Sequence, residues 1–257
     1  MAADDGDLAA AIEAIALQAG GAIMKIYGRG FSVESKADAS PVTEADRVAE
    51  AIIVTALREL TPDIPVVAEE EVSAGHRPEV GAGPFWLVDP LDGTREFVSR
   101  NGDFTVNIAL IRGGEPVLGT VHVPVKAETY TAAGYGQVSR RRGADAAQAI
   151  RARAPAGDGL VAMVSRSHGS PETDDFLADF DIKECIAAGS SLKFCRLAEG
   201  AADLYPRLGR TMEWDTAAGH AVLACAGGSV RRLDGGPLRY GKNGFENPHF
   251  LARGRTE

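Results

Sequence analysis

The sequence predicts an α+β protein in which helices pack on two β-sheets. Three observations indicate this class: two amphipathic helical patterns open the chain, a series of short strands follows, and strands then alternate with helices to the end. The chain has 257 residues, of which 45% are hydrophobic and 25% charged. A chain of this size and composition can bury a sizeable core in one large domain or in two of ordinary size.

Two helices are expected near the N-terminus. The first is indicated by apolar residues at helical spacing, with Asp7 as its cap and Gly28 as its stop: Leu8, Ile12, Ile15, Ala19, Ile23 and Ile26. The second follows Thr43, whose spacing to Asp46 fits a capping box. Read from the residues alone, that pair is a structural feature of a helix start.

Short strands dominate the next part of the chain. They are expected at 64–68, 85–88, 105–111, 117–123 and 128–132. The Gly-rich turn at 112–115 separates two of them in the manner of a hairpin.

Residues 137–158 are polar and rich in Ala and Gly, which favours a domain junction there. We therefore expect an N-terminal α+β unit at 1–150, with a largely antiparallel sheet, and a C-terminal α/β unit at 151–257. In the second unit, strands are expected at 160–165, 182–187 and 204–206, and helices at 172–180, 191–199 and 216–226.

Charge and composition exclude several classes of protein. A net charge of −9 argues against a broad nucleic-acid-binding face, and the basic run at 140–142 is expected to be a solvated loop. No apolar run approaches the roughly 20 residues of a membrane span, and the N-terminus is acidic where a secretory signal is basic. The scattered Cys185, Cys195 and Cys225 indicate reduced core thiols. Together these features indicate a cytoplasmic protein.

A carboxylate site is expected where the strand at 85–88 ends. Pro90 lacks the N–H group that a strand ladder needs, so the ladder is expected to stop at Asp89 and the chain to turn. In a tight turn, residues three apart can project to the same side, which would bring Asp89, Asp92 and the Leu91 carbonyl to one point. Taken alone, the pair also fits an Asx turn at Asp92 with Asp89 capping a neighbouring helix.

The residues after this turn suit an anion. Gly93 leaves the backbone open, and a helix starting at Thr94 would direct its free N–H groups and positive dipole end to the same point. A cation site beside an anion site suits a metal-bound phosphate.

Further acids follow a strand end at 69–71 and, far downstream, stand at Asp215 near a helix start, where an N-cap is the alternative. If Glu69, Asp89, Asp92 and Asp215 converge, each like-charge pair near 4 Å costs about 4 kcal/mol at a surface-like dielectric. Such a cluster needs protons or divalent cations. Carboxylate and carbonyl donors without His or Cys select Mg²⁺ over Zn²⁺.

Three segments resemble the signatures of the lithium-sensitive, Mg²⁺-dependent phosphatases of the inositol monophosphatase superfamily: AEE at 68–70, DPLDGT at 89–94 and WDTAAG at 214–219. Two longer stretches, 86–111 and 189–228, and VSRSH at 164–168 resemble its bacterial 3′(2′),5′-bisphosphate nucleotidase branch. The resemblance spans roughly residues 8–250 and is weakest at 137–158. It implies the layered α/β/α/β/α sandwich of the sugar-phosphatase fold.

By matching position, the resemblance implies that Glu69, Asp89 and the Leu91 carbonyl hold one Mg²⁺. Asp89, Asp92 and Asp215 would hold a second, and a third, weaker ion near Glu69 fits the family's pattern. Most of these ligands belong to the N-terminal unit, and Asp215 comes from the C-terminal one.

The resemblance also assigns catalytic roles. Gly93 and Thr94 would donate backbone N–H groups to the scissile phosphate. Asp46 would accept a hydrogen bond from the Thr94 hydroxyl, and this pair would act with Glu69 to orient the attacking water.

Four more positions match residues that contact the second phosphate or the nucleoside in similar nucleotidases: His168, Ser190, Lys193 and Arg207. The expected substrate contacts are completed by Glu69, Leu91, Asp92, Gly93, Thr94 and Asp215. Without the resemblance, His168 fits a structural histidine and Lys193 a solvated lysine on a helix. Lys36 is a further position within reach of the metal site, with solvent exposure as the alternative.

The implied activity is hydrolysis of the 3′-phosphate of adenosine 3′,5′-bisphosphate, and of its sulfated relative, to release phosphate in sulfur assimilation. One alternative is a phosphatase of the same superfamily that acts on inositol monophosphate or a sugar phosphate. A third hypothesis is a non-catalytic Mg²⁺- or nucleotide-binding protein. We expect a small phosphorylated nucleotide as partner, no nucleic acid, a monomer or homodimer, and a cytoplasmic location with peripheral contact at the inner membrane as a further expectation.

Overall fold

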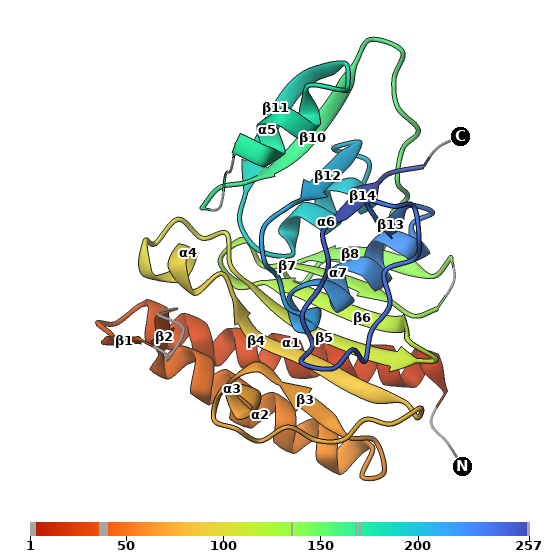
Figure 1. Ribbon diagram of the computed structural model, residues 1–257. Helices are drawn as coiled ribbons and strands as arrows, with labels where there is room; N and C mark the ends of the chain where they lie inside the picture. Colours follow the sequence, from red (N-terminus) through yellow and green to blue (C-terminus); the bar gives the residue numbers. More distant parts are fainter. Residues whose placement is uncertain (1–3, 36–40, 135, 168, 170, 256–257) are drawn as a thin grey trace.

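Two helices form the first layer of the molecule. The computed structural model describes residues 4–35, 41–134, 136–167, 169 and 171–255. Helices α1 (Asp5–Tyr27) and α2 (Glu44–Leu60) pack on each other and on one face of a seven-stranded sheet (Figure 1). Their apolar faces and the sheet enclose one hydrophobic core around Ile12, Ile53 and Trp86. Thr43 caps α2, and its capping box with Asp46 is confirmed.

The seven-stranded sheet is antiparallel except for the pairing of β3 with β4. In sheet order, its strands are β3 (Val66–Ala68), β4 (Phe85–Asp92), β5 (Thr105–Arg112), β6 (Glu115–Val123), β7 (Glu128–Ala132), β8 (Val138–Arg142) and β9 (Gln148–Ala149). The expected hairpin at 112–115 is confirmed: Arg112 pairs with Glu115, and both intervening glycines have positive φ. Such a two-residue turn matches the twist of its strands.

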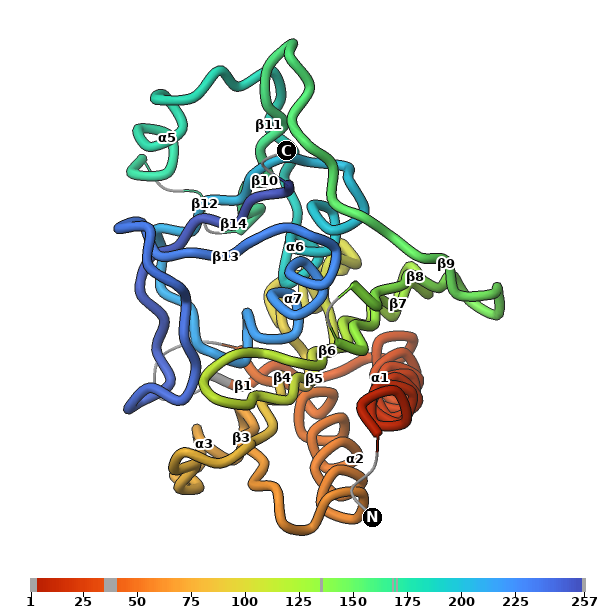
Figure 2. Tube along the Cα trace, turned by 90° about the vertical axis from the view of Figure 1, so that its right-hand side faces the viewer, coloured from red at the N-terminus to blue at the C-terminus, as the bar shows by residue number. Residues whose placement is uncertain are grey.

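The third layer consists of α6 (Leu192–Ala198) and α7 (Glu213–Cys225), which lie between the two sheets (Figure 2). Helix α7 lies so close to β6 that a Cβ atom at Gly119 would be 2.8 Å from the Ala218 carbonyl oxygen. The second core surrounds these helices and contains Phe194, Tyr205 and Phe250.

The second sheet has five strands. In order they are β11 (Ile182–Ala188), β10 (Leu160–Ser165), β12 (Leu204–Arg207), β14 (Phe250–Arg253) and β13 (Ser229–Arg232). Helix α5 (Pro171–Leu177) covers its outer side near β12. The layers therefore follow the order α/β/α/β/α, and the predicted fold is confirmed.

Small elements complete the fold: a hairpin of β1 (Val33–Ser35) and β2 (Pro41–Thr43), and the short helices α3 (Glu69–Ser73), α4 (Thr94–Val98) and η1 (Pro124–Lys126). Both α3 and α4 begin directly after a strand that enters the site. At both places the chain changes from strand to helix within one or two residues.

Several local predictions were wrong. Of the cysteines expected to be core thiols, Cys195 is buried, but Cys185 is exposed and Cys225 is half-buried. Asp4, not Asp7, caps α1, because its side chain accepts the Gly6 N–H at 2.7 Å. Helix α7 begins at Glu213 rather than at residue 216. Residues 140–142 form strand β8 and not a solvated loop, since Glu128 on β7 and Glu13 on α1 supply carboxylates for their guanidinium groups.

The polar stretch at 137–158 is thus partly strand, because β8 and β9 extend the first sheet to residue 149. The division of the chain at residue 150 stays a prediction.

Helix α1 is long and apolar enough to cross a membrane by length and composition, with a mean hydropathy of 1.4. It is the one such helix in the described part of the chain. Its buried side chains pack against α2 and β6 in the first core, and the core helix of a globular protein has the same composition.

Candidate active site

A β-bulge in β4 brings two aspartates to one face of the sheet. Asp89 pairs with Asn107 and Asp92 with Thr105, so three steps along β4 match two steps along β5. Residues three apart in a regular strand face opposite sides, but the extra residue of a bulge restores a common side. The ladder is interrupted at Pro90 and Leu91 but resumes at Asp92, so the prediction that it ends at Asp89 was wrong. The predicted convergence of the two carboxyl groups is nevertheless observed.

Four carboxyl groups meet at this bulge, and we call Glu69, Asp89, Asp92 and Asp215 the acid cluster. Burial raises the pKa of Asp89 well above its usual value, and the charges of Glu69, Asp92 and Asp215 raise it further. Glu69 is also hydrogen-bonded to Asp89. Burial and the charges of Asp92 and Glu69 raise the pKa of Asp215 to about 8. The charges of neighbouring acids thus add to burial at both Asp89 and Asp215.

Asp92 is held by polar groups from two other elements. Its Oδ2 accepts hydrogen bonds from the backbone N–H of Ser191 at 2.7 Å and from the Asn107 side chain at 3.2 Å. Burial raises its pKa to about 6, although the charge of Lys193 opposes this shift. Ser191 also donates its hydroxyl to the Asp215 carbonyl at 2.6 Å. The start of α6 thus ties the bulge to α7, a role for Ser191 and Asn107 that the sequence analysis missed.

Asp215 stands in the first turn of α7 and is not its N-cap. Its Oδ2 accepts the backbone N–H of Met212, the residue that precedes the helix, at 2.8 Å. Asn247 from the C-terminal segment donates to the Met212 carbonyl at 2.8 Å and to the Thr216 hydroxyl at 3.0 Å. The tail therefore fixes the turn that presents Asp215 to the cluster.

Glu69 begins α3, and a carboxylate from another helix caps this helix. Glu50 on α2 accepts the backbone N–H groups of Glu70 and Glu71, each at 2.8 Å. Ala68, the N-cap residue, has no side chain that could do so. Burial raises the pKa of Glu50 to about 7. Glu50 could not be predicted from the sequence, because its partners lie 20 and 21 residues away.

Asp46 stands one helical turn before Glu50 and reaches the other side of the site. Its Oδ2 accepts both the backbone N–H and the hydroxyl of Thr43 at 2.7 Å, and its Oδ1 accepts the Thr94 hydroxyl at 3.1 Å. Burial raises the pKa of Asp46. Gly93 adopts φ 92° directly before α4, and a Cβ there would lie 3.2 Å from Glu96 Oε2. The left-handed turn at Gly93 thus places Thr94 beside Asp46.

A cavity of about 580 Å³ opens over the acid cluster. All members of the cluster line it, together with Leu91, Gly93, Thr94, Ser165, Ser190, Lys193 and Arg207. The expected site residues are therefore brought together at this cavity. Asp46 does not line it but contacts it through the Thr94 hydroxyl. The two remaining candidates, His168 and Lys36, lie outside the described residues.

The cationic side of the cavity is built by the second sheet and α6. Lys193 is 3% exposed, so the alternative of a solvated lysine was wrong. Its Nζ donates to the Ser190 carbonyl at 2.7 Å and lies 5.0 Å from the centre of the Tyr205 ring. Burial lowers the pKa of Lys193 to about 8, while the Asp92 charge opposes that change. Arg207 Nη2 donates to the Arg210 carbonyl at 3.0 Å.

The acid cluster suits a hard divalent cation. Its donors are four carboxylates and the Leu91 carbonyl at the cavity wall, without His or Cys. In the described residues, no three His, Cys, Asp or Glu side chains already form an assembled metal-binding group. The raised pKa values of Asp89, Asp92 and Asp215 nevertheless show that their shared negative charge is unfavourable by itself, which a cation would reverse.

The fold and this pocket can be compared with those of known protein families. The chain belongs to the inositol monophosphatase family, a family of metal-dependent phosphatases, because the family's model matches residues 4–254.

Within that family, the chain is similar to the 3′(2′),5′-bisphosphate nucleotidase CysQ of Escherichia coli K12, with 47% identity over 240 residues that cover 92% of this chain and 95% of the relative. The crystal structure of CysQ from Bacteroides thetaiotaomicron superposes with a TM-score of 0.82 at 39% identity and covers 98% of both chains. An inositol monophosphatase from Thermotoga maritima has a TM-score of 0.76 at 27% identity, covering 95% of this chain and 90% of its own.

Proposed function

We propose that the protein is a Mg²⁺-dependent 3′(2′),5′-bisphosphate nucleotidase that hydrolyses the 3′-phosphate of adenosine 3′,5′-bisphosphate to leave AMP and phosphate. The observation that carries the proposal is one cavity with an acid cluster on one side and the buried cation of Lys193 on the other. In a substrate with two phosphates, the reacting phosphate needs the metal ions of the acid cluster, and the other phosphate needs a cation such as Lys193. The 47% identity to a CysQ nucleotidase over nearly the whole chain supports this choice over an inositol or sugar phosphatase. The sulfated relative of the substrate and a role in sulfur assimilation extend the same proposal.

Two Mg²⁺ ions would be held by the acid cluster: one by Glu69, Asp89 and the Leu91 carbonyl, the other by Asp89, Asp92 and Asp215. A third, weaker ion near Glu69 belongs to the same proposal. Bound Mg²⁺ would supply charge neutralisation of the phosphoryl oxygens and a lower pKa for water. The N–H groups of Ser191 and Met212 hold Oδ2 of Asp92 and Asp215 in place, so these carboxyl groups are oriented before any ion arrives.

The chain's own contribution to catalysis would come from Thr94 and Asp46. Thr43 fixes Oδ2 of Asp46 through two hydrogen bonds, which leaves Oδ1 to hold the Thr94 hydroxyl. A water molecule beside Thr94 and Glu69 would then be oriented for in-line attack, and it would give its proton to Thr94 Oγ1 as the Thr94 hydroxyl gives its own proton to Asp46 Oδ1. The backbone N–H groups of Gly93 and Thr94 would bind the scissile phosphate.

The second phosphate would bind between Ser190, Lys193 and Arg207. Ser190 Oγ and Arg207 Nε are buried polar atoms without a hydrogen-bond partner among the described residues. Both residues line the cavity, and a buried donor without a partner is costly unless a ligand satisfies it. A phosphate oxygen would satisfy both and pair with the ammonium group of Lys193. His168 is proposed as a further contact.

Phosphate release from a substrate panel tests the proposal. The purified protein is assayed with adenosine 3′,5′-bisphosphate, its sulfated relative, inositol 1-phosphate and fructose 1,6-bisphosphate, each with and without Mg²⁺. We expect the highest kcat/KM on the bisphosphate nucleotides and no turnover after chelation. Faster turnover of inositol phosphate would assign the protein to the alternative activity, and absence of turnover on every substrate would leave a binding protein.

Oligomeric state and location are part of the same proposal. We expect a monomer or homodimer in the cytoplasm that takes a small phosphorylated nucleotide, with peripheral contact at the inner membrane as the further expectation. Size-exclusion chromatography with light scattering and cell fractionation test these two points.

A further inference from the structure

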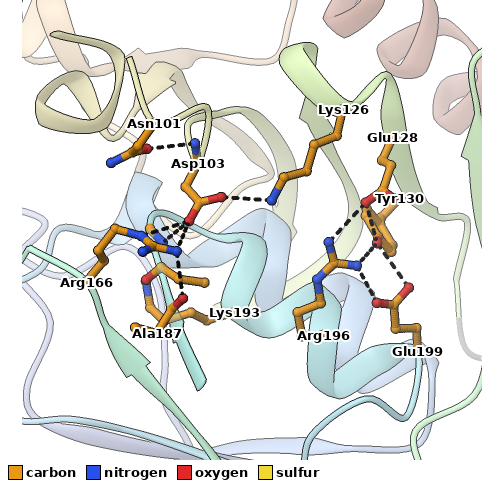
Figure 3. A network of polar contacts seen from close by, with 12 residues as sticks. Asn101, Asp103, Lys126, Glu128, Tyr130, Arg166, Ala187, Lys193, Arg196 and Glu199 are labelled. Atoms are coloured by element: carbon orange, nitrogen blue, oxygen red, sulfur yellow. Dashed lines mark hydrogen bonds and ion pairs between the residues drawn. The ribbon is translucent and has the colours of Figure 1, made fainter. Parts of the chain in front are cut away.

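Asp103 lies outside the cavity but contacts two segments that build its wall. It stands in the loop between α4 and β5 and is 5% exposed. Its carboxylate accepts Lys126 Nζ on Oδ1 at 2.8 Å and the Arg166 guanidinium on Oδ2 at 2.9 Å and 3.1 Å (Figure 3). The same Oδ2 accepts the backbone N–H of Gly189 at 3.3 Å. One carboxylate oxygen thus holds both β10 and β11 at their ends.

The residues held in this way are direct neighbours of cavity residues. Arg166 follows Ser165, and Gly189 precedes Ser190; both serines line the cavity. Arg166 is also bound to the end of β11, since its Nη2 donates to the Ala187 carbonyl at 2.9 Å. The position of these two segments relative to each other therefore depends on Asp103, which belongs to the loop before β5 of the seven-stranded sheet.

Two further contacts show that this junction is tight. Ser167 donates its hydroxyl to the carboxylate of Glu96, a buried residue of α4. A Cβ atom at Gly189 would lie 2.5 Å from the Asp103 carbonyl oxygen and 2.7 Å from Glu96 Cγ. The segment at 189–190 can approach the loop at 103 only because residue 189 is glycine.

The lowered pKa of Asp103 indicates that its carboxylate keeps the charge on which these ion pairs depend. Burial alone would raise the pKa of Asp103, but the hydrogen bonds and charges of Lys126 and Arg166 outweigh burial and lower it. The carboxylate is therefore ionised over the whole neutral range. Charge-assisted hydrogen bonds of this kind are stronger and more directional than neutral ones.

We propose that Asp103 is a positioning residue for substrate specificity: it fixes the segments at 165–167 and 189–190 so that the cavity wall around Ser190 and Lys193 binds the second, non-reacting phosphate. The inference rests on the proposed function. It assigns no contact between Asp103 and substrate, because the carboxylate would repel a phosphate and lies behind the wall.

The test compares three variants: Asp103→Asn, Arg166→Met and the matched control Lys126→Met. Lys126 pairs with the other oxygen of the same carboxylate, whereas Arg166 itself belongs to a wall segment. For each, KM and kcat are measured on adenosine 3′,5′-bisphosphate and on adenosine 3′-monophosphate, which lacks the second phosphate. Thermal unfolding is recorded in parallel.

We expect KM for the bisphosphate to rise roughly tenfold in Asp103→Asn and Arg166→Met, the factor that matches the loss of about one charge-assisted hydrogen bond. Its kcat and the constants for the monophosphate should stay near those of the parent protein, and Lys126→Met should keep the parent KM. Because the Arg166 side chain is 46% exposed, its variant decides the question if Asp103→Asn fails to fold.

A purely structural role predicts a different pattern. An unchanged KM for the bisphosphate in a folded Arg166→Met protein, or an equal rise in Lys126→Met, would overturn the inference. If the parent protein releases no phosphate from the bisphosphate, the proposed function itself fails, which this first measurement reveals before any variant is compared.

Discussion

Thr94 donates its hydroxyl to Asp46 Oδ1 at 3.1 Å, and this single bond joins α2 to the segment at 89–94 across 48 residues of sequence. Asp46 is anchored by Thr43 on its other oxygen. Glu50, one turn later on the same helix, holds α3. Helix α2 therefore fixes both segments that contribute carboxylates from the first sheet to the acid cluster.

Replacing Asp46 by Asn should abolish most of the activity while the protein stays folded. An amide offers one acceptor where the carboxylate uses two, so either Thr43 or Thr94 loses its partner. We expect kcat to fall about 100-fold, the lower range for a lost acid–base group. Steady-state assays at saturating Mg²⁺ measure it, with Glu44→Gln at the exposed start of α2 as control. Full activity in Asp46→Asn would contradict a catalytic role for the pair.

Replacing Glu50 by Gln should weaken Mg²⁺ binding. The amide NH₂ group cannot accept the second backbone N–H of α3, so Glu69 loses part of its support. We expect the dissociation constant for Mg²⁺, measured by titration calorimetry, to rise roughly tenfold, as for other residues that orient metal ligands. Glu59→Gln, an exposed change on the same helix, should leave it unaltered. Equal affinities in both variants would show that α3 holds its place without Glu50.

His122 should make the fold less stable as the pH falls. Burial lowers its pKa to about 4, below the value of 6.5 expected in the unfolded chain. The unfolded state then binds more protons between these values, so stability is full above pH 6.5 and is lost as the pH falls towards 4. Between pH 7 and pH 5, His122 should cost about 2 kcal/mol.

Urea unfolding of the parent protein and of His122→Gln at both pH values isolates this contribution, because other groups titrate in both proteins. The difference in unfolding free energy between the two proteins should shrink at pH 5. A constant difference would mean that His122 titrates normally in the fold.

Arg196 should be important for stability and not for catalysis. It donates to Tyr130 Oη at 3.1 Å, to Glu199 at 2.5 Å and to Glu128 at 3.2 Å, within the half-buried ion network that Figure 3 shows beside Asp103. Arg196→Met leaves Glu128 and Glu199 to Arg140 and Arg142 and removes one charged hydrogen bond from each, and we expect a loss of about 2 kcal/mol in unfolding free energy. Arg239→Met, in an exposed pair with Glu115, should cost less than about 1 kcal/mol. Similar losses in both variants would contradict the argument.

Much of the fold could be predicted because it follows from local patterns. Apolar spacing indicated α1 and α2, and alternation with glycine turns indicated the strands from β4 to β7. The predictions that failed concern charged residues whose partners lie on other strands or helices. The arginines at 140–142 read as a solvated loop because nothing near them in sequence shows that Glu128 and Glu13 neutralise them.

The same limit applies to the site. Its carboxylates could be predicted from their motifs, since strand ends and short spacing are local features. Glu50, Ser191, Asn107 and Asp103 could not, because each acts through a backbone or side-chain partner at least 15 residues away. Lys193 looked solvated on its helix, and only Tyr205 and the carbonyls of β11 and the loop that follows it explain its burial.

The bulge in β4 and the spacing of three residues between Asp89 and Asp92 are useful to the site only in combination. In a regular strand without the extra residue of the bulge, acids three residues apart would face opposite sides, and one carboxylate would turn towards the apolar side covered by α1 and α2. Changes in sequence at positions 90 and 91 that keep the bulge therefore leave both acids on the cavity side, whereas changes that flatten it separate them.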